Sequence, residues 1–165
     1  MSSKKAINLL RRGMTPPMTV YGPNVKLLSA GANTLTAEDS GKTIVFNVAA
    51  ATTVTLPSPR LGMQFHFITT IAATGDHEII AATNAHGFLG GVNIVSTTAA
   101  KADAFSAATT GVNDYITMNG GTTGGAAGGH LWVVALLDSS AAKCWGVGGT
   151  LNGVGSTMAT PFADS

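Results

Sequence analysis

Side chains able to carry out chemistry are sparse in this chain, which has four histidines and one cysteine in 165 residues. It contains no Gly-x-Ser-x-Gly nucleophile elbow, His-Glu-x-x-His zinc helix, P-loop or Cys-x-x-Cys pair. The segment Asn119–Gly129 holds six glycines but lacks the Lys–Ser/Thr pair with which a P-loop binds phosphate. We therefore expect a protein that is not an enzyme and that uses no cofactor.

The histidines are first considered as possible metal ligands. His77 lies between Asp76 and Glu78, and carboxylates and imidazoles can bind divalent ions. Neighbours in a strand point to opposite faces, so the two carboxylates would face away from His77. This pattern favours a solvated hairpin end over a metal site. His66 is predicted to be a surface histidine, with a place in a subunit interface as the alternative, and His130 has no visible partner.

Cys144 is the single thiol, so no internal disulfide can form. A reactive thiolate needs nearby bases or a helix N-terminus to lower its pKa. Lys143 is adjacent, but it would point to the opposite face of a strand. Cys144 is therefore predicted to be a small buried hydrophobe.

A carbohydrate-binding site would need exposed aromatic residues, because sugar rings pack against aromatic rings in such sites. Trp132 and Trp145 both lie in apolar segments, which predicts that both are buried. The sequence therefore does not favour a sugar-binding sandwich.

The histidines, the cysteine and the aromatic residues must be positioned by short segments rich in Val, Ile, Thr and Phe. These segments are separated by turn residues such as Asp39-Ser40-Gly41, and no segment shows sustained helical periodicity. This spacing predicts an all-β fold, a jelly-roll-like β-sandwich or barrel. The expected strands are 25–28, 34–36, 43–48, 52–56, 63–71, 78–81, 92–95, 115–118, 131–137 and 144–147.

The side-chain pattern within these segments predicts which of them lie inside. Residues 63–67 alternate between apolar and polar, so Phe65 should face the core and His66 the other side. Leu131–Leu137 does not alternate, which predicts a central strand covered on both faces. Asn119–Gly129 is predicted to be a flexible loop outside the core, and the Ala-rich segment 99–108 a loop or single helical turn.

Charge is low and unevenly distributed. Charged residues make up 10% of the chain, against about 25% in an average soluble protein, and the net charge is +1. Residues 1–37 carry five bases and no acid, whereas residues 38–165 carry four bases and eight acids. We assign residues 1–24 to a basic extended arm and residues 25–165 to the β-sandwich body. Such a composition suits a chain that packs against copies of itself or a larger assembly.

Two classes of partner are not expected. The four basic residues near the start would contact only a few phosphates, so no nucleic acid is predicted as a partner. No apolar run approaches the roughly 20 residues of a membrane-spanning helix, so no membrane partner is predicted either.

A strand–turn–strand pattern supplies a family resemblance. The segments Leu35–Asn47, Val54–Pro59 and Gly62–Phe67, followed late in the chain by Trp145–Gly149, resemble β-rich virion proteins of tailed bacteriophages, including capsid cement (decoration) proteins. The likeness covers about residues 30–150 and carries no catalytic residues. It implies a homotrimer on the outer capsid surface of a virion, with the major capsid protein as partner.

On this resemblance, we expect a non-catalytic protein that binds between capsomers and stabilises the shell. The arm either orders on its partner or is an ordinary disordered terminus. In the first case its bases would contact an acidic capsid surface and its apolar residues would anchor it; the capsid-binding residues predicted are Lys4, Lys5, Leu9, Leu10, Arg11, Arg12 and Tyr21.

Two alternatives remain open at this point. The first is a tail-fibre, head-fibre or spike receptor-binding module that contacts a host glycan or protein. The second is a small β-sandwich hydrolase, which would depend on His77 or His130.

Overall fold

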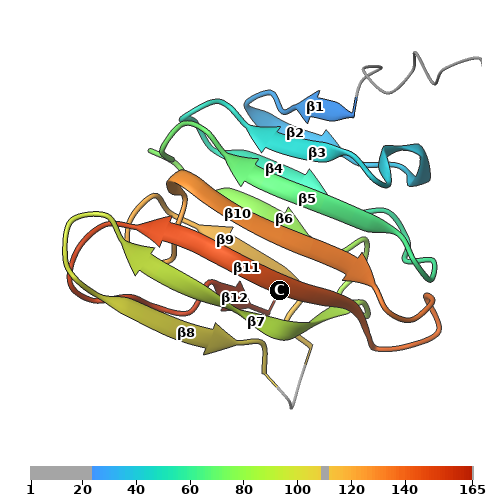
Figure 1. Cartoon of the computed structure of the whole chain (residues 1–165). Helices are drawn as coiled ribbons and strands as arrows, with labels where there is room; N and C mark the ends of the chain where they lie inside the picture. The colour runs from blue at the N-terminus through green and yellow to red at the C-terminus, as the bar shows by residue number, and fades with distance from the viewer. Residues whose placement is uncertain (1–23, 109–111, 165) are drawn as a thin grey trace, which may run out of the picture.

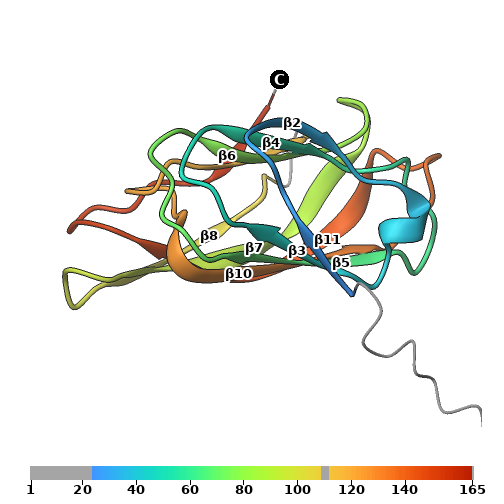
Figure 2. The ribbon, with the colours of Figure 1, turned by 90° about the horizontal axis from the view of Figure 1, so that it is seen from above.

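A computed structural model describes residues 24–108 and 112–164. Two β-sheets face each other, with the seven-stranded sheet in front in Figure 1 and the layers separated in Figure 2. The order of the larger sheet is β1 (Val25–Leu27), β3 (Thr43–Phe46), β5 (Gln64–Thr69), β10 (Ala126–Ala135), β11 (Lys143–Gly153), β7 (Gly87–Ser96) and β8 (Ala102–Ser106). The order of the smaller sheet is β12 (Phe162–Ala163), β9 (Tyr115–Met118), β6 (His77–Ile80), β4 (Thr52–Thr55) and β2 (Gly31–Thr34). The predicted all-β sandwich is confirmed.

The first six strands alternate between the two sheets. Within the larger sheet β1, β3 and β5 pair in parallel, and within the smaller sheet β2, β4 and β6 do the same. Parallel neighbours need a crossover connection, and here a strand of the opposite sheet provides it where many proteins use a helix. The sequence pattern did not indicate this parallel coil, because short strands and turns look alike in parallel and antiparallel sheets.

A buried carboxylate fixes the turn between β2 and β3. Asp39 ends a short 3-10 helix (Ala37–Asp39) and accepts hydrogen bonds of 2.8 Å from the Nζ atoms of both Lys26 and Lys42. The backbone N–H of Thr36 donates a third, of 3.0 Å. Burial opposes the ionisation of Asp39, but these hydrogen bonds outweigh it and hold its pKa well below the usual range. Asp39 thereby ties β1 to the turn that leads into β3.

The core lies between the two sheets. As predicted, Phe65 faces inward and is buried, whereas His66 lies on the other face of β5. The ring centroid of Phe65 is 6.0 Å from that of Trp145 on β11. The largest fully buried side chains come from both sheets and include Trp145, Phe46, Phe65, Phe67, Phe88, Ile79 and Ile116.

The prediction for segment 99–108 is wrong. It contains β8, an edge strand that pairs antiparallel with β7. Phe105 of β8 packs against the core, while Ala104 points outward. Alanine content suggested a helical turn, but pairing with β7 and the burial of one face decide the conformation.

The prediction that Asn119–Gly129 lies outside the core is wrong for its second half. Strand β10 begins at Ala126, and Gly124, Gly125 and Ala126 are buried. Gly125 has a φ of +91°, and a Cβ there would lie 2.9 Å from the backbone N of Gly120. Glycine allows the chain to fold back this closely, so these residues serve packing rather than flexibility.

The prediction for Leu131–Leu137 is right in one respect and wrong in the other. The strand is central, because β10 pairs with β5 on one side and β11 on the other. It is not covered on both faces: Trp132 is 49% exposed and Leu136 is 48% exposed. A two-layer sandwich covers only one face of each sheet, so alternation turns Trp132 away from the core.

Replacing Asp39 with Asn is expected to lower the free energy of unfolding by about 2 kcal/mol near neutral pH, because two lysines lose their buried partner. The lysines are partly exposed, which keeps the loss below that of a fully buried pair. Because folding lowers the pKa of Asp39, its contribution is complete above about pH 4 and is lost as the pH falls further. Denaturant unfolding measures both effects.

The matched control for this prediction is Glu38→Gln, which removes the charge of an exposed neighbour. It should change the free energy of unfolding by less than about 0.5 kcal/mol. Equal losses in the two variants would contradict the role assigned to Asp39.

Candidate functional site

His77, which the sequence offered as a possible metal ligand, is part of the core. His77 is 0% exposed, its Nε2 lies 2.9 Å from the carbonyl oxygen of Val48, and its ring stacks on Phe46 at a centroid distance of 4.6 Å. Burial lowers the pKa of His77, although the hydrogen bonds to backbone carbonyls act against this. The predicted solvated hairpin end is therefore wrong, because β6 lies inside the smaller sheet and directs His77 into the sandwich.

The neighbouring carboxylate points the other way, as predicted. Glu78 accepts a 2.9 Å hydrogen bond from the Oγ1 of Thr53 on the outer side of the smaller sheet. Among residues 24–108 and 112–164, no group of three His, Cys, Asp or Glu side chains is arranged to hold a metal ion. None of the helical structure in the same residues is long and apolar enough to cross a membrane.

Cys144 is buried, as predicted, and burial raises the pKa of its thiol. A raised pKa keeps the thiol protonated, which is the opposite of what a nucleophile requires. Its neighbour Trp145 is also fully buried. This part of β11 therefore serves the core.

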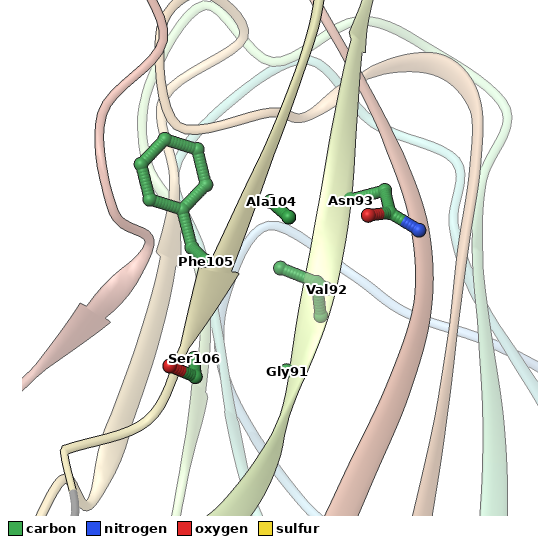
Figure 3. Close-up of a pocket in the computed structure, with 6 residues that line it drawn as sticks. All are labelled: Gly91, Val92, Asn93, Ala104, Phe105 and Ser106. Carbon is green, nitrogen blue, oxygen red and sulfur yellow. The ribbon is translucent and has the colours of Figure 1, made fainter.

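One surface hollow of about 290 Å³ lies where β7 meets the edge strand β8. Figure 3 shows that Asn93 and Phe105 point in different directions and do not converge on a common point. The residues that line the hollow provide no acid or base, so nothing in it could activate the hydroxyl of Ser106 as a nucleophile. The residues that line it are Gly91, Val92, Asn93, Ala104, Phe105 and Ser106.

The larger sheet has an outer face, turned toward the viewer in Figure 1, that carries no charge along three cross-strand rows. Paired residues in neighbouring strands share a face, so the register identifies these rows. We call them together the outer sheet face. The rows are Val25, Thr43, His66, Trp132 and Gly148; then Leu27, Val45, Ile68, His130, Thr150, Asn93 and Ala104; then Gln64, Val134, Gly146 and Leu89. None of them is Asp, Glu, Lys or Arg.

Trp132 lies at the middle of the outer sheet face. Its ring stacks on that of His66, with centroids 3.9 Å apart and planes 9° apart, and the ring of His130 is 6.1 Å from that of His66. Partial burial, and secondarily the proximity of His130, lower the pKa of His66. The ring of His66 is therefore mostly neutral near pH 7.

Two shallow hollows flank Trp132. One, of about 350 Å³, includes His66 and His130 in its lining. The other, of about 320 Å³, is bordered by Leu136 and floored by glycines of β11. A Cβ added to Gly148, directly opposite Trp132 in the ladder, would meet no atom within 4 Å. The tryptophan is thus a raised apolar feature beside a depression.

The outer side of the smaller sheet differs in character. One cross-strand row there consists of Ala32, Thr53, Glu78 and Thr117, and the next includes Ile80 and Tyr115. The first of these rows carries a carboxylate, as an ordinary solvated surface does. The contrast in charge marks the outer sheet face as the candidate functional site, because it combines an uncharged surface with exposed apolar side chains such as Val25, Leu27 and Trp132, a combination found at interaction sites.

The seven capsid-binding residues predicted from the sequence all lie among residues 1–23, outside the described residues. The sequence does not reveal the outer sheet face, because Leu131–Leu137 is apolar throughout and this pattern predicts a strand covered on both sides. The available signal was in β5, whose Gln64 and His66 alternate with buried phenylalanines and show that one face of this sheet is open. Any strand paired with β5 must share that open face.

No family model, curated protein or solved structure matches this chain.

His77 predicts how stability depends on pH. An unfolded histidine binds its proton near pH 6.5, whereas folding lowers the pKa of His77, so the unfolded state binds more protons below that pH. The free energy of unfolding should be highest above about pH 6.5 and fall as the pH decreases toward 5. Thermal or denaturant unfolding across this range measures the slope.

In His77→Gln the slope should decrease, and it should decrease more than in His66→Gln, because His77 is completely buried and His66 is not. An unchanged slope in His77→Gln would contradict the assignment.

Proposed function

We propose that this protein is a non-catalytic structural protein of a bacteriophage virion, which binds the outer capsid surface between capsomers and stabilises the shell. The observation that carries the proposal is the outer sheet face, uncharged along three rows with Trp132 at its middle. It is suited to contact with protein, and such contacts are what a decorating protein makes. The sequence resemblance over residues 30–150 supplies the virion context.

Attachment would depend on the arm. The arm is basic, whereas residues 38–165 carry an excess of acids, so the arm is the part suited to an acidic capsid surface. Its bases would contact that surface and its apolar residues would anchor it; the residues proposed are Lys4, Lys5, Arg11 and Arg12 with Leu9, Leu10 and Tyr21.

Stabilisation would come from repetition. In a homotrimer three arms act together, so each additional contact forms at a high effective concentration. A ligand that binds the assembled shell and not its separated subunits shifts the equilibrium toward the shell by mass action. Contacts that are individually weak therefore suffice to stabilise the shell when they recur over the capsid lattice.

Binding to purified undecorated shells tests the proposal. The full chain should bind and raise the temperature at which the shells break open, whereas Arg11→Glu with Arg12→Glu should bind at least about tenfold more weakly, because two attractive charges become repulsive. Deletion of residues 1–22 should abolish attachment and leave the circular dichroism of the body unchanged. Cosedimentation measures binding.

The matched control reverses two bases of the body, Arg60→Glu with Lys101→Glu, which changes the net charge by the same amount. This control should bind as the wild type does. Absence of binding by the wild type, or equal losses in the two charge variants, would reject the proposal.

A second candidate is a tail-fibre, head-fibre or spike module that contacts a host glycan. The specific observation in its favour is the half-exposed Trp132, although its apolar segment predicts burial. An exposed indole can stack on the apolar face of a sugar ring, and His66 and His130 provide polar groups beside it.

The two candidates make different predictions for intact host cells. A receptor-binding module would bind the cells, free sugar would compete, and Trp132→Ala would abolish binding. A capsid-decorating protein would show none of these effects.

A further inference from the structure

We propose that the outer sheet face is where copies of this chain join, with Trp132 and the glycine-floored hollow beside it at the centre of the contact. The inference deepens the proposed function, on which it rests for the idea that the decorating unit consists of identical chains. The contact itself requires no capsid, so it can be tested on the purified protein alone.

The size of the face is compatible with a weak interface that depends on concentration. The rows run over six neighbouring strands from β1 to β7, which at about 4.8 Å per strand spans roughly 24 Å. Along β10 the three rows extend from His130 to Val134, which is roughly 17 Å. The product, roughly 400 Å², is about half of what each partner contributes to a standard protein–protein interface.

The charge of the face favours a second copy over other protein partners. A partner that recognises the basic arm has to be acidic, but the outer sheet face offers it no charge to pair with. Two uncharged faces can meet without like-charge repulsion and without burying an unpaired charge. The same face on another copy of the chain is therefore a compatible surface.

The shape of the outer sheet face is also compatible with contact between the faces of two copies. Trp132 stands out from β10, and the space above Gly148, its partner in the ladder, is empty. Leu136, a further half-exposed apolar side chain, borders the same hollow. A closed rotational assembly presents the projection of one copy to a depression on the next. Tryptophan is also the residue type most enriched among those that dominate binding energy at interfaces.

The test compares the association of the full-length protein and three variants by sedimentation velocity over a range of concentrations. The wild type should associate at micromolar concentrations. Trp132→Ala removes the central contact and Gly148→Arg fills the hollow with a charge, so each should weaken association by about 30-fold or more. Because Gly148 has an ordinary φ and open space above it, we expect the variant to fold.

The control is Thr117→Arg, which places the same side chain on the outer side of the smaller sheet, beside Glu78. It should associate as the wild type does. Thermal unfolding and circular dichroism establish that each variant is folded, and Trp132→Ala decides the matter should Gly148→Arg fail to fold.

The outcomes separate this inference from the proposed function. A wild type that stays monomeric at 100 µM, or variants that associate as well as the wild type, would overturn the inference. Association weakened by both face variants and not by the control would support it, whether the assembly has two or three copies. A protein that associates in this manner but does not bind shells would overturn the proposed function alone.

Discussion

The burial of one face of each sheet against the other is the constraint on which the rest of this structure depends. Phe65 of β5 and Trp145 of β11 approach each other in the core, and the strand between them, β10, has to present its alternate residues to the same space. Every side chain that points inward along β10 is balanced by one that points outward. A strand composed almost entirely of apolar residues consequently builds the core with one half and an exposed apolar surface with the other.

This constraint has different consequences for the inside and the outside of the sandwich. Toward the inside it places polar groups where they cannot be solvated, so His77 takes a backbone carbonyl as its partner and its pKa falls. Toward the outside it assembles Trp132, His66 and the glycines of β11 into a surface without charge. The inward groups make the stability of the sandwich depend on pH, and the outward group is the part of the molecule suited to a protein partner.

The residues that carry the family resemblance have a structural explanation of their own. Asp39 binds the side chains of Lys26 and Lys42, and it holds β1 against the turn that leads into β3. Such a turn stabilises the parallel coil of the first six strands, but it provides no binding site. The functional proposals therefore depend on the outer sheet face and the basic arm, and the motif indicates the scaffold that presents them.

Local chemistry determined much of the fold in advance. Alternating residues at 63–67, turn residues such as Gly41 and the absence of helical periodicity sufficed to predict strands, an all-β sandwich or barrel, the inward direction of Phe65 and the burial of Cys144. The limits of such patterns are visible in Ala102–Ser106, whose composition suggests a loop or a helical turn and whose pairing with β7 makes it a strand.

Only the tertiary structure decided which strands are neighbours, and with them the candidate site. Trp132, His66 and Gly148 are far apart in the sequence and meet because β10 pairs with β5 and β11 in one register. The burial of His77 and the exposure of Trp132 depend in the same way on how many layers cover each sheet. Side-chain type and spacing report on neighbours within a strand, whereas pairing between strands and coverage of a face are properties of the whole chain.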